Sequence, residues 1–118
     1  MRSPNQIIIF TDVQVSIDEA TELAEGFKLL GEPTRVRILY ALLEHGEMNV
    51  GDLARLVETS ETTVSHAMRL LRTAAIVRNR RDGRSIFYRL DDDHVRQLLD
   101  LSREHLSHRE PTADREDD

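Results

Sequence analysis

The sequence predicts a mainly α-helical fold with a β-hairpin wing, a winged helix-turn-helix that we expect to be homodimeric. Three observations predict this class. Two short amphipathic stretches, 50–57 and 61–73, flank the tight turn Glu58-Thr59, as in two helices joined by a short turn. Asp82-Gly83 lies between two alternating stretches, which is a strong hairpin signal. A further stretch, 91–108, has an apolar stripe for packing, and in a chain of 118 residues dimerisation would help to bury a core.

The composition restricts the classes of function. The chain has no cysteine, which excludes disulfides and thiolate metal sites, so any metal must be held by nitrogen and oxygen. It has no apolar run long enough to span a membrane and no signal-peptide pattern, so we expect a soluble, cytoplasmic protein without a membrane partner. No nucleophile–base constellation and no site for a small organic substrate is indicated, so an enzyme is not expected.

The charge is distributed unevenly along the chain. The formal net charge is −6, yet residues 60–90 carry 7 basic and 2 acidic side chains, a net charge of +5. Residues 1–59 carry 5 basic and 10 acidic side chains, and residues 91–118 carry 4 and 10. A basic middle third is the electrostatic footprint of a nucleic-acid-binding surface, and its basic residues are all arginine, which suits phosphate and guanine recognition.

Capping residues divide the chain into elements. Ser16 with Glu19 makes a capping box, Pro33 suits a first helical position, and Asn49 and Ser60 are good N-caps. We therefore expect helices at about 17–30, 33–44, 50–57, 61–73 and 91–108, and strands at 76–80 and 84–90 joined by the turn Arg81-Asp82-Gly83. An N-terminal arm, 1–15, precedes the domain at 16–108, and an acidic, disordered tail, 109–118, follows it. Within the arm, Ile7 to Phe10 read as a short strand, as an arm packing on a partner, or as part of a disordered segment.

The helix expected at 61–73 has two faces. Apolar side chains that should point inward here and in the preceding helix are Leu53, Ala54, Leu56, Val64, Ala67, Met68 and Leu71. The other face has short hydroxyl side chains near the helix N-terminus, which can donate to phosphates, and longer side chains that can reach base edges in the major groove. The arginines of the hairpin could reach phosphates or the minor groove. The candidate DNA-binding residues are Ser60, Thr62, Thr63, Ser65, His66, Arg69, Arg80, Arg81 and Arg84, and the alternative is an ordinary solvated face.

Four candidate metal ligands lie in the last helix. Asp92 and His94 lie at its start, and His105 and His108 lie one turn apart near its end. The pairs cannot meet within one chain, because the eleven residues from His94 to His105 span roughly 16 Å of helix and a metal–nitrogen bond only about 2 Å. The same helix of a second subunit, lying antiparallel, would complete two identical sites of one oxygen and three nitrogens, which suits zinc. The alternative is that the histidines are surface residues and Asp92 only a helix cap.

Three stretches together resemble one family: LGEPTRVRILYAL at 30–42, SETTVSHAMRLLRTAAIV at 60–77 and RRDGRSIFYRL at 80–90. They are similar to the ArsR/SmtB family of metal-sensing bacterial repressors, and the resemblance covers roughly residues 23–108. It implies a winged-helix homodimer that binds double-stranded operator DNA without metal and releases it when metal binds.

Members of that family differ in where the metal binds. The site on a cysteine pair of the third helix is excluded, because residues 48–52 (MNVGD) stand there. The last-helix site has the pattern Asp, one residue, His, ten residues, His, two residues, then His or Glu. Asp92, His94, His105 and His108 fill it, similar to the zinc- and cobalt-responsive members. A nickel- and cobalt-sensing branch adds histidines near the termini, which this sequence lacks, so Zn(II) is favoured over Ni(II) as the effector, with Co(II) or Ni(II) as the alternatives.

The resemblance also implies a mechanism. The apo homodimer presents two recognition helices to the half-sites of an inverted repeat, and metal holds the dimer in an orientation that fits DNA worse. A hydrogen bond from the free N–H of His105 to the backbone near His66 is the suggested link between the two sites. Two alternatives stay open: a nickel- or cobalt-responsive repressor of the same fold, and a winged-helix regulator that senses no metal.

Overall fold

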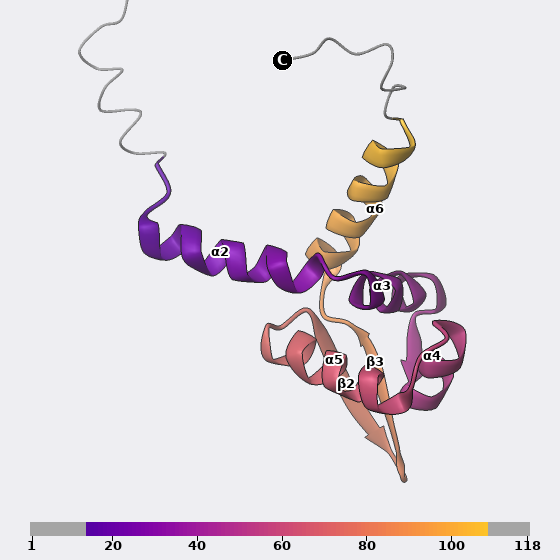
Figure 1. Cartoon of the computed structure of the whole chain (residues 1–118). Helices are drawn as coiled ribbons and strands as arrows, with labels where there is room; N and C mark the ends of the chain where they lie inside the picture. Colours follow the sequence, from indigo (N-terminus) through magenta and orange to yellow (C-terminus); the bar gives the residue numbers. More distant parts are fainter. Residues whose placement is uncertain (1–13, 109–118) are drawn as a thin grey trace, which may run out of the picture.

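The structure, a computed structural model, describes residues 14–108 and has the predicted helices and strands in the predicted order, with one short strand added (Figure 1). The elements are α2 (Ile17–Leu30), α3 (Pro33–His45), β1 (Glu47–Asn49), α4 (Val50–Leu56), α5 (Glu61–Thr73), β2 (Val77–Asp82), β3 (Ser85–Leu90) and α6 (Asp93–Ser107). The predictions for residues 7–10 and 109–118 fall outside the described residues. Between residues 14 and 108, no helix is long and apolar enough to cross a membrane.

Each predicted N-cap side chain forms its bond, but within the described residues the Glu19 side chain does not return the second bond of the predicted capping box. The side chains of Ser16, Asn49 and Ser60 each accept a hydrogen bond from the backbone N–H three residues further on, at 2.8–3.1 Å. A cap that was not predicted begins α3, where the carboxylate of Glu32 accepts from the backbone N–H of Arg35 at 2.9 Å. These bonds satisfy N–H groups that a helix start otherwise leaves without partners, so the local sequence fixes where the helices begin.

The core lies between α3, α4, α5 and the sheet. Its buried side chains are Ile38, Leu39, Ala41, Leu42, Leu53, Ala54, Val57, Val64, Ala67, Met68, Leu71, Val77, Leu90 and Leu99. The inward face predicted for α5 is confirmed, since all four of its residues are buried. The inward prediction for Leu56 was wrong, because that side chain is 46% exposed. Leu53, Ala54 and Val57 define the buried side of α4, and Leu56 points about a quarter turn away from it.

The sheet has three antiparallel strands in the order β1-β3-β2. Strand β1 was not predicted; its Met48 lies opposite Tyr88 of β3. The hairpin turn predicted at 81–83 begins two residues too early. The pairing of Asp82 with Ser85 closes the hairpin, so Gly83 and Arg84 form the turn, while Arg81 and Asp82 belong to β2. Gly83 has a φ of 65°, a left-handed conformation that two-residue hairpin turns favour.

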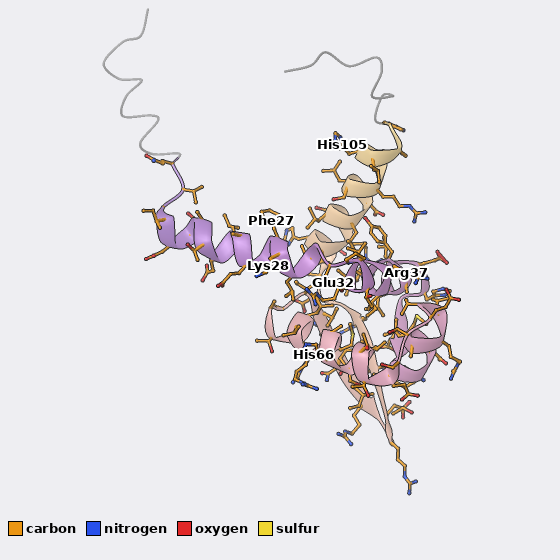
Figure 2. All side chains as sticks on the ribbon, in the orientation of Figure 1. Phe27, Lys28, Glu32, Arg37, His66 and His105 are labelled. Carbon is orange, nitrogen blue, oxygen red and sulfur yellow. The ribbon has the colours of Figure 1, made fainter. Side chains whose placement is uncertain are left out.

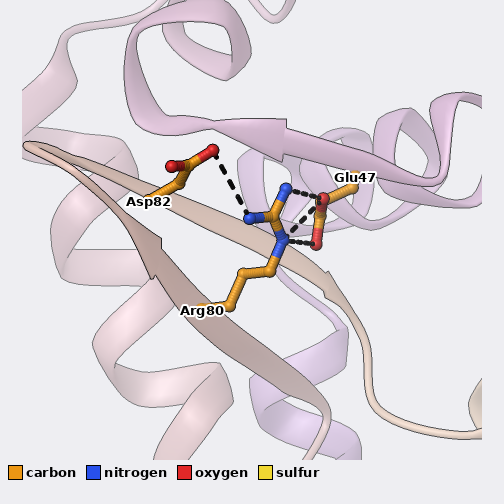
Figure 3. A network of polar contacts seen from close by, with 3 residues as sticks. All are labelled: Glu47, Arg80 and Asp82. Atoms are coloured by element: carbon orange, nitrogen blue, oxygen red, sulfur yellow. Dashed lines mark hydrogen bonds and ion pairs between the residues drawn. The ribbon is translucent and has the colours of Figure 1, made fainter.

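An ion pair joins β1 to β2 across the sheet (Figure 3). Nε and Nη2 of Arg80 donate to the carboxylate of Glu47 at 2.8–3.0 Å, and Nη1 lies 3.7 Å from Asp82. The guanidinium carbon also lies 4.9 Å from the ring centroid of Phe87 on the intervening strand β3. The hydrogen bonds from Arg80 hold the pKa of Glu47 below its usual value. This contact, the wing brace, fixes the hairpin against the edge strand β1.

The end of α5 gives a test of backbone strain. Ala75 has a φ of 60°; its N–H donates to the carbonyl of Arg72, and the N–H of Ile76 donates to that of Leu71. Glycine is common at this position of a helix end, because the left-handed conformation costs other residues about 1 kcal/mol or more. We expect Ala75→Gly to raise the free energy of unfolding by roughly 1 kcal/mol, measured by urea denaturation. Ala74→Gly, at a φ of −86°, should lower it instead, and stabilisation by both changes would contradict the explanation.

The wing brace should contribute to stability in a pH-dependent way. Because the pKa of Glu47 is lower in the folded state, its contribution is present above the unfolded value, about 4.3, and is lost as the pH falls through the folded value. We expect Glu47→Gln to lower the urea midpoint at pH 7, and the difference from wild type to shrink below about pH 4. Glu25→Gln on the exposed side of α2 is the control. A Glu47→Gln difference that is the same at pH 7 and pH 3.5 would argue against the brace.

Candidate functional site

The outer face of α5 presents the predicted DNA-binding side chains. Thr62, Ser65, His66 and Arg69 follow the spacing i, i+3, i+4 and i+7, which places them on one side of the helix. Thr62, His66 and Arg69 are exposed and Ser65 is half-buried. This face lies opposite the buried side of α5, so the helix is held by its apolar side and offers a polar one to solvent.

The start of α5 is organised by two hydroxyl groups. Oγ of Ser60 accepts from the backbone N–H of Thr63 at 3.0 Å and donates to Oγ1 of Thr63 at 2.9 Å. The two hydroxyl oxygens therefore lie together at the helix N-terminus, where the helix dipole favours a negative charge. Both side chains are exposed and open to a phosphate group.

The wing arginines fall into two groups. Arg81 and Arg84 are exposed and form no ion pair with another residue in the described range. Arg80, predicted with them, is held in the wing brace by Glu47, and its part in binding DNA stays a prediction. Arg78 forms an ion pair with Asp91 at 2.7 Å, which ties β2 to the start of α6. A single-sequence pattern of arginines does not distinguish these roles, because the carboxylate partners come from other elements.

One basic residue beside this surface was missed by the sequence reasoning. Arg55 on α4, together with Glu61 and Ser65 on α5 and Arg84 at the wing turn, lines a hollow of about 480 Å³ between the helix-turn-helix and the wing. Arg55 is exposed and pairs with Asp52 one turn earlier. Its position in the first helix of the pair, whose usual place is across the DNA backbone, was the available signal.

The first pair of candidate metal ligands is organised by the start of α6. Oδ1 of Asp92 accepts from the backbone N–H of Val95 at 3.1 Å, so Asp92 caps the helix as predicted. Its other oxygen, Oδ2, lies 3.6 Å from Nδ1 of His94. The Val95 N–H, followed by His94, holds the pKa of Asp92 below its usual value, so the carboxylate is ionised and available as an anionic ligand.

The second pair lies at the other end of α6. His105 and His108 are exposed, and within residues 14–108 no three His, Asp or Glu side chains converge on one point in a single chain. Figure 2 places His105 in the outer part of α6, away from His66 on α5. The predicted hydrogen bond from His105 to the backbone near His66 is not among the contacts of the described chain, so it stays a prediction for an assembly of two copies.

The outer side of α6 has a regular spacing that places three of the four candidate ligands on one face, while Asp92 precedes the helix as its N-cap. The residues His94, Leu98, Leu101, His105 and His108 follow one another at intervals of four, three, four and three. This is the spacing of a seam between two packed helices. Leu98 is 41% exposed and Leu101 64%, so the apolar centre of this seam is uncovered in one chain.

Helix α2 leaves further apolar surface uncovered. None of its residues is buried, and Leu23 and Phe27 are 49% and 63% exposed. Such exposed apolar faces on two neighbouring elements are typical of an interaction surface. The donor set itself, one carboxylate and three imidazoles, is of the nitrogen and oxygen type that zinc accepts, so the residues fit the metal that the sequence predicted.

Comparison with known proteins finds a matching family and several similar regulators. Residues 32–79 match the family described as "Bacterial regulatory protein, arsR family". The chain is 43% identical over 79 residues to a cadmium resistance transcriptional regulatory protein CadC homologue of Staphylococcus aureus, covering 67% of this chain and 65% of the relative. It is 41% identical over 92 residues to a transcriptional repressor SmtB homologue of Synechocystis, covering 78% and 69%.

Solved structures agree with the fold. The homodimeric winged helix-turn-helix DNA-binding domain of Mb0332 from Mycobacterium bovis, a possible ArsR-family regulator, superposes with a TM-score of 0.68 and 29% identity, over 84% of this chain and 97% of that one. The winged helix-turn-helix is thus confirmed. Because the matching family and the relatives are transcriptional regulators, the expectation that the chain is not an enzyme is confirmed as well. The chain belongs to the ArsR family of helix-turn-helix transcriptional regulators.

Proposed function

We propose that this protein is a metal-responsive transcriptional repressor, which binds operator DNA as an apo homodimer and leaves it when Zn(II) binds between the two α6 helices. The observation that carries the proposal is the seam of α6, in which histidines occupy both ends and leucines the exposed centre. A helix that only packed against a second copy would need the leucines but not the histidines.

The spacing of the seam is consistent with one antiparallel register. If two copies of α6 lie side by side so that Leu98 faces Leu101 of the second copy, His94 faces the second copy's His105 in the same register. Asp92 then lies close to the second copy's His108. Two-fold symmetry repeats this arrangement at the other end. This register would cover the leucines at the centre of the seam. At each end of the dimer it would also bring the Asp92–His94 pair of one copy to the His105–His108 pair of the other.

The protein's own residues define what the metal can do. Asp92 and His94 are positioned by the cap of α6, whereas His105 and His108 project from its exposed last turns. A bound Zn(II) would supply bonds that join the start of one α6 to the end of the other. The two subunits would then keep one relative orientation. DNA affinity falls only if, in that orientation, the separation of the two α5 helices differs from the separation of the two half-sites.

The DNA-binding residues proposed for the repressor are those on the outer side of α5 and on the wing. His66 and Arg69 are exposed and long enough to reach base edges, while Ser60 and Thr63 lie at the helix N-terminus, suited to phosphate. Arg81 and Arg84 extend the basic surface to the wing tip. The visible spectrum of the Co(II) complex would separate the proposed four-coordinate site from the six-coordinate site of a nickel- or cobalt-responsive repressor.

The dimer seam can be tested by a charge at its centre. We expect Leu101→Glu to weaken dimerisation by roughly a hundred-fold or more, because each dimer loses two buried leucines, each contributing about 1.5 kcal/mol or more. Analytical ultracentrifugation over a concentration series measures the dissociation constant. Leu56→Glu alters a similarly exposed leucine on α4 and should leave it unchanged. Equal effects of the two changes would refute the seam.

Metal release can be tested by fluorescence anisotropy with labelled operator DNA titrated with Zn(II). We expect wild type to bind without zinc and to dissociate as zinc is added. His105→Ala should bind DNA equally well but lose the response, since one of four ligands is missing. His45→Ala, which changes an exposed histidine at the end of α3 that is not a candidate ligand, is the control and should respond like wild type. A wild-type protein that stays on DNA in zinc would leave a winged-helix regulator that senses no metal.

A further inference from the structure

Within residues 14–108, one side-chain hydrogen bond joins α3 to α6, in addition to the packing of Leu99 and Val95 against the core. The hydroxyl of Tyr40 donates to the main-chain carbonyl of Leu99 at 2.6 Å. Leu99 is the one buried residue of α6, so this bond lies where the helix is anchored. Burial raises the pKa of Tyr40, so the hydroxyl keeps its proton and remains a donor.

The neighbouring side chain on the same side of α3 holds the helix-turn-helix. Arg37 lies three residues before Tyr40, one turn along the helix. Its Nη1 donates to the carbonyl of Val57 at 2.8 Å, and its Nη2 lies 3.8 Å from the carboxylate of Glu58. These two residues form the turn between α4 and α5, and Glu58 has a φ of 58°, so the turn is held in a conformation that needs support.

Elsewhere along this face, α3 and α6 are loosely packed. Two hollows of about 410 and 440 Å³ flank the contact, and both are lined by Arg37, Tyr40 and Arg103. The guanidinium of Arg103 on α6 lies 5.7 Å from the ring centroid of Tyr40. Every residue of α6 after Leu99 is exposed. The angle between α6 and the body therefore depends on few contacts, and Tyr40 supplies a directional one.

We propose that Arg37 and Tyr40 are positioning residues that form one mechanical link, in which α3 transmits the position of α6 to the turn before the recognition helix α5. The link rests on the proposed function, because α6 acquires a defined position only when it pairs with a second copy. In the dimer it sets the separation of the two α5 helices. It differs from the predicted bond between His105 and His66, since it runs through α3 and uses no metal ligand.

Tyr40→Phe removes only the hydroxyl and is the main test. The DNA is a fluorescein-labelled inverted repeat that wild type selects from a random-sequence pool, with versions in which one base pair is inserted or deleted between the half-sites. We expect wild type to discriminate sharply among the three spacings without zinc. Tyr40→Phe should reduce that discrimination by about five-fold, the effect of one ordinary hydrogen bond. Tyr88→Phe, which removes the other tyrosine hydroxyl of the chain, is the matched control and should behave like wild type.

A second readout is the ratio of DNA dissociation constants with and without zinc. We expect Tyr40→Phe to reduce this ratio by about five-fold while its zinc affinity, measured without DNA by competition with a chelator, stays that of wild type. Arg37→Met should have a similar effect, and the double variant should add little further loss, because both changes break one link. Dimerisation and far-ultraviolet circular dichroism establish that the variants remain folded.

The outcomes separate this inference from the proposed function. If zinc does not change wild-type DNA binding, metal sensing fails and the link is judged by half-site spacing alone. The link is overturned if Tyr40→Phe is folded and dimeric and its preference among the three half-site spacings matches that of wild type within two-fold. Where zinc acts on wild type, the ratio of DNA dissociation constants with and without zinc must also match within two-fold. Additive effects of Arg37→Met and Tyr40→Phe would also overturn it, because two independent structural defects would then explain the losses.

Discussion

Apolar surface that one chain cannot cover is the constraint on which the rest of this structure depends. The core between α3, α5 and the sheet is closed, but α2 has no buried residue and α6 has one. Figure 1 shows both helices extending from the body, so they offer a surface without adding much to the core. In the proposed dimer these helices supply the interface, and the region that binds metal is then also the region that sets how the two DNA-binding bodies are spaced. In that dimer, sensing and dimerisation would share one surface, because the same side of α6 has both the exposed leucines and three of the candidate ligands.

Local chemistry made much of the fold predictable, and contacts between distant residues account for what was missed. The capping oxygens of Ser16, Asn49 and Ser60 act within four residues, so the helix starts could be placed from sequence. Strand β1 has three residues, too few to show alternation, and it exists because β3 pairs with it. The hairpin turn was predicted to begin two residues too early, because a dipeptide signal indicates a turn without fixing which residue pair closes it.

The candidate site shows the same division. The buried side of α5 follows from periodicity, and the outer residues follow from it by exclusion. The wing brace could not be predicted, because Glu47 and Arg80 are 33 residues apart and meet only when β1 adds to the sheet. The metal site is harder still to predict from one sequence. The spacing of the candidate ligands defines two pairs in one chain, and whether those pairs meet depends on a second copy and stays a prediction.

The two halves of the proposed metal site differ in how firmly the chain holds them. Asp92 divides its carboxylate between two tasks, with one oxygen capping α6 and the other beside His94, so this half is positioned before any metal arrives. His105 and His108 project from exposed turns beyond Leu99, the last buried point of α6. Metal binding would therefore cost more conformational entropy at the end of α6 than at its start. The end is also the part of α6 that would move on metal binding. Because α6 is anchored at Leu99 and exposed beyond it, ordering its last turns on a metal would change the angle that α6 makes with the body at Leu99. At that anchor the carbonyl of Leu99 accepts the hydroxyl of Tyr40.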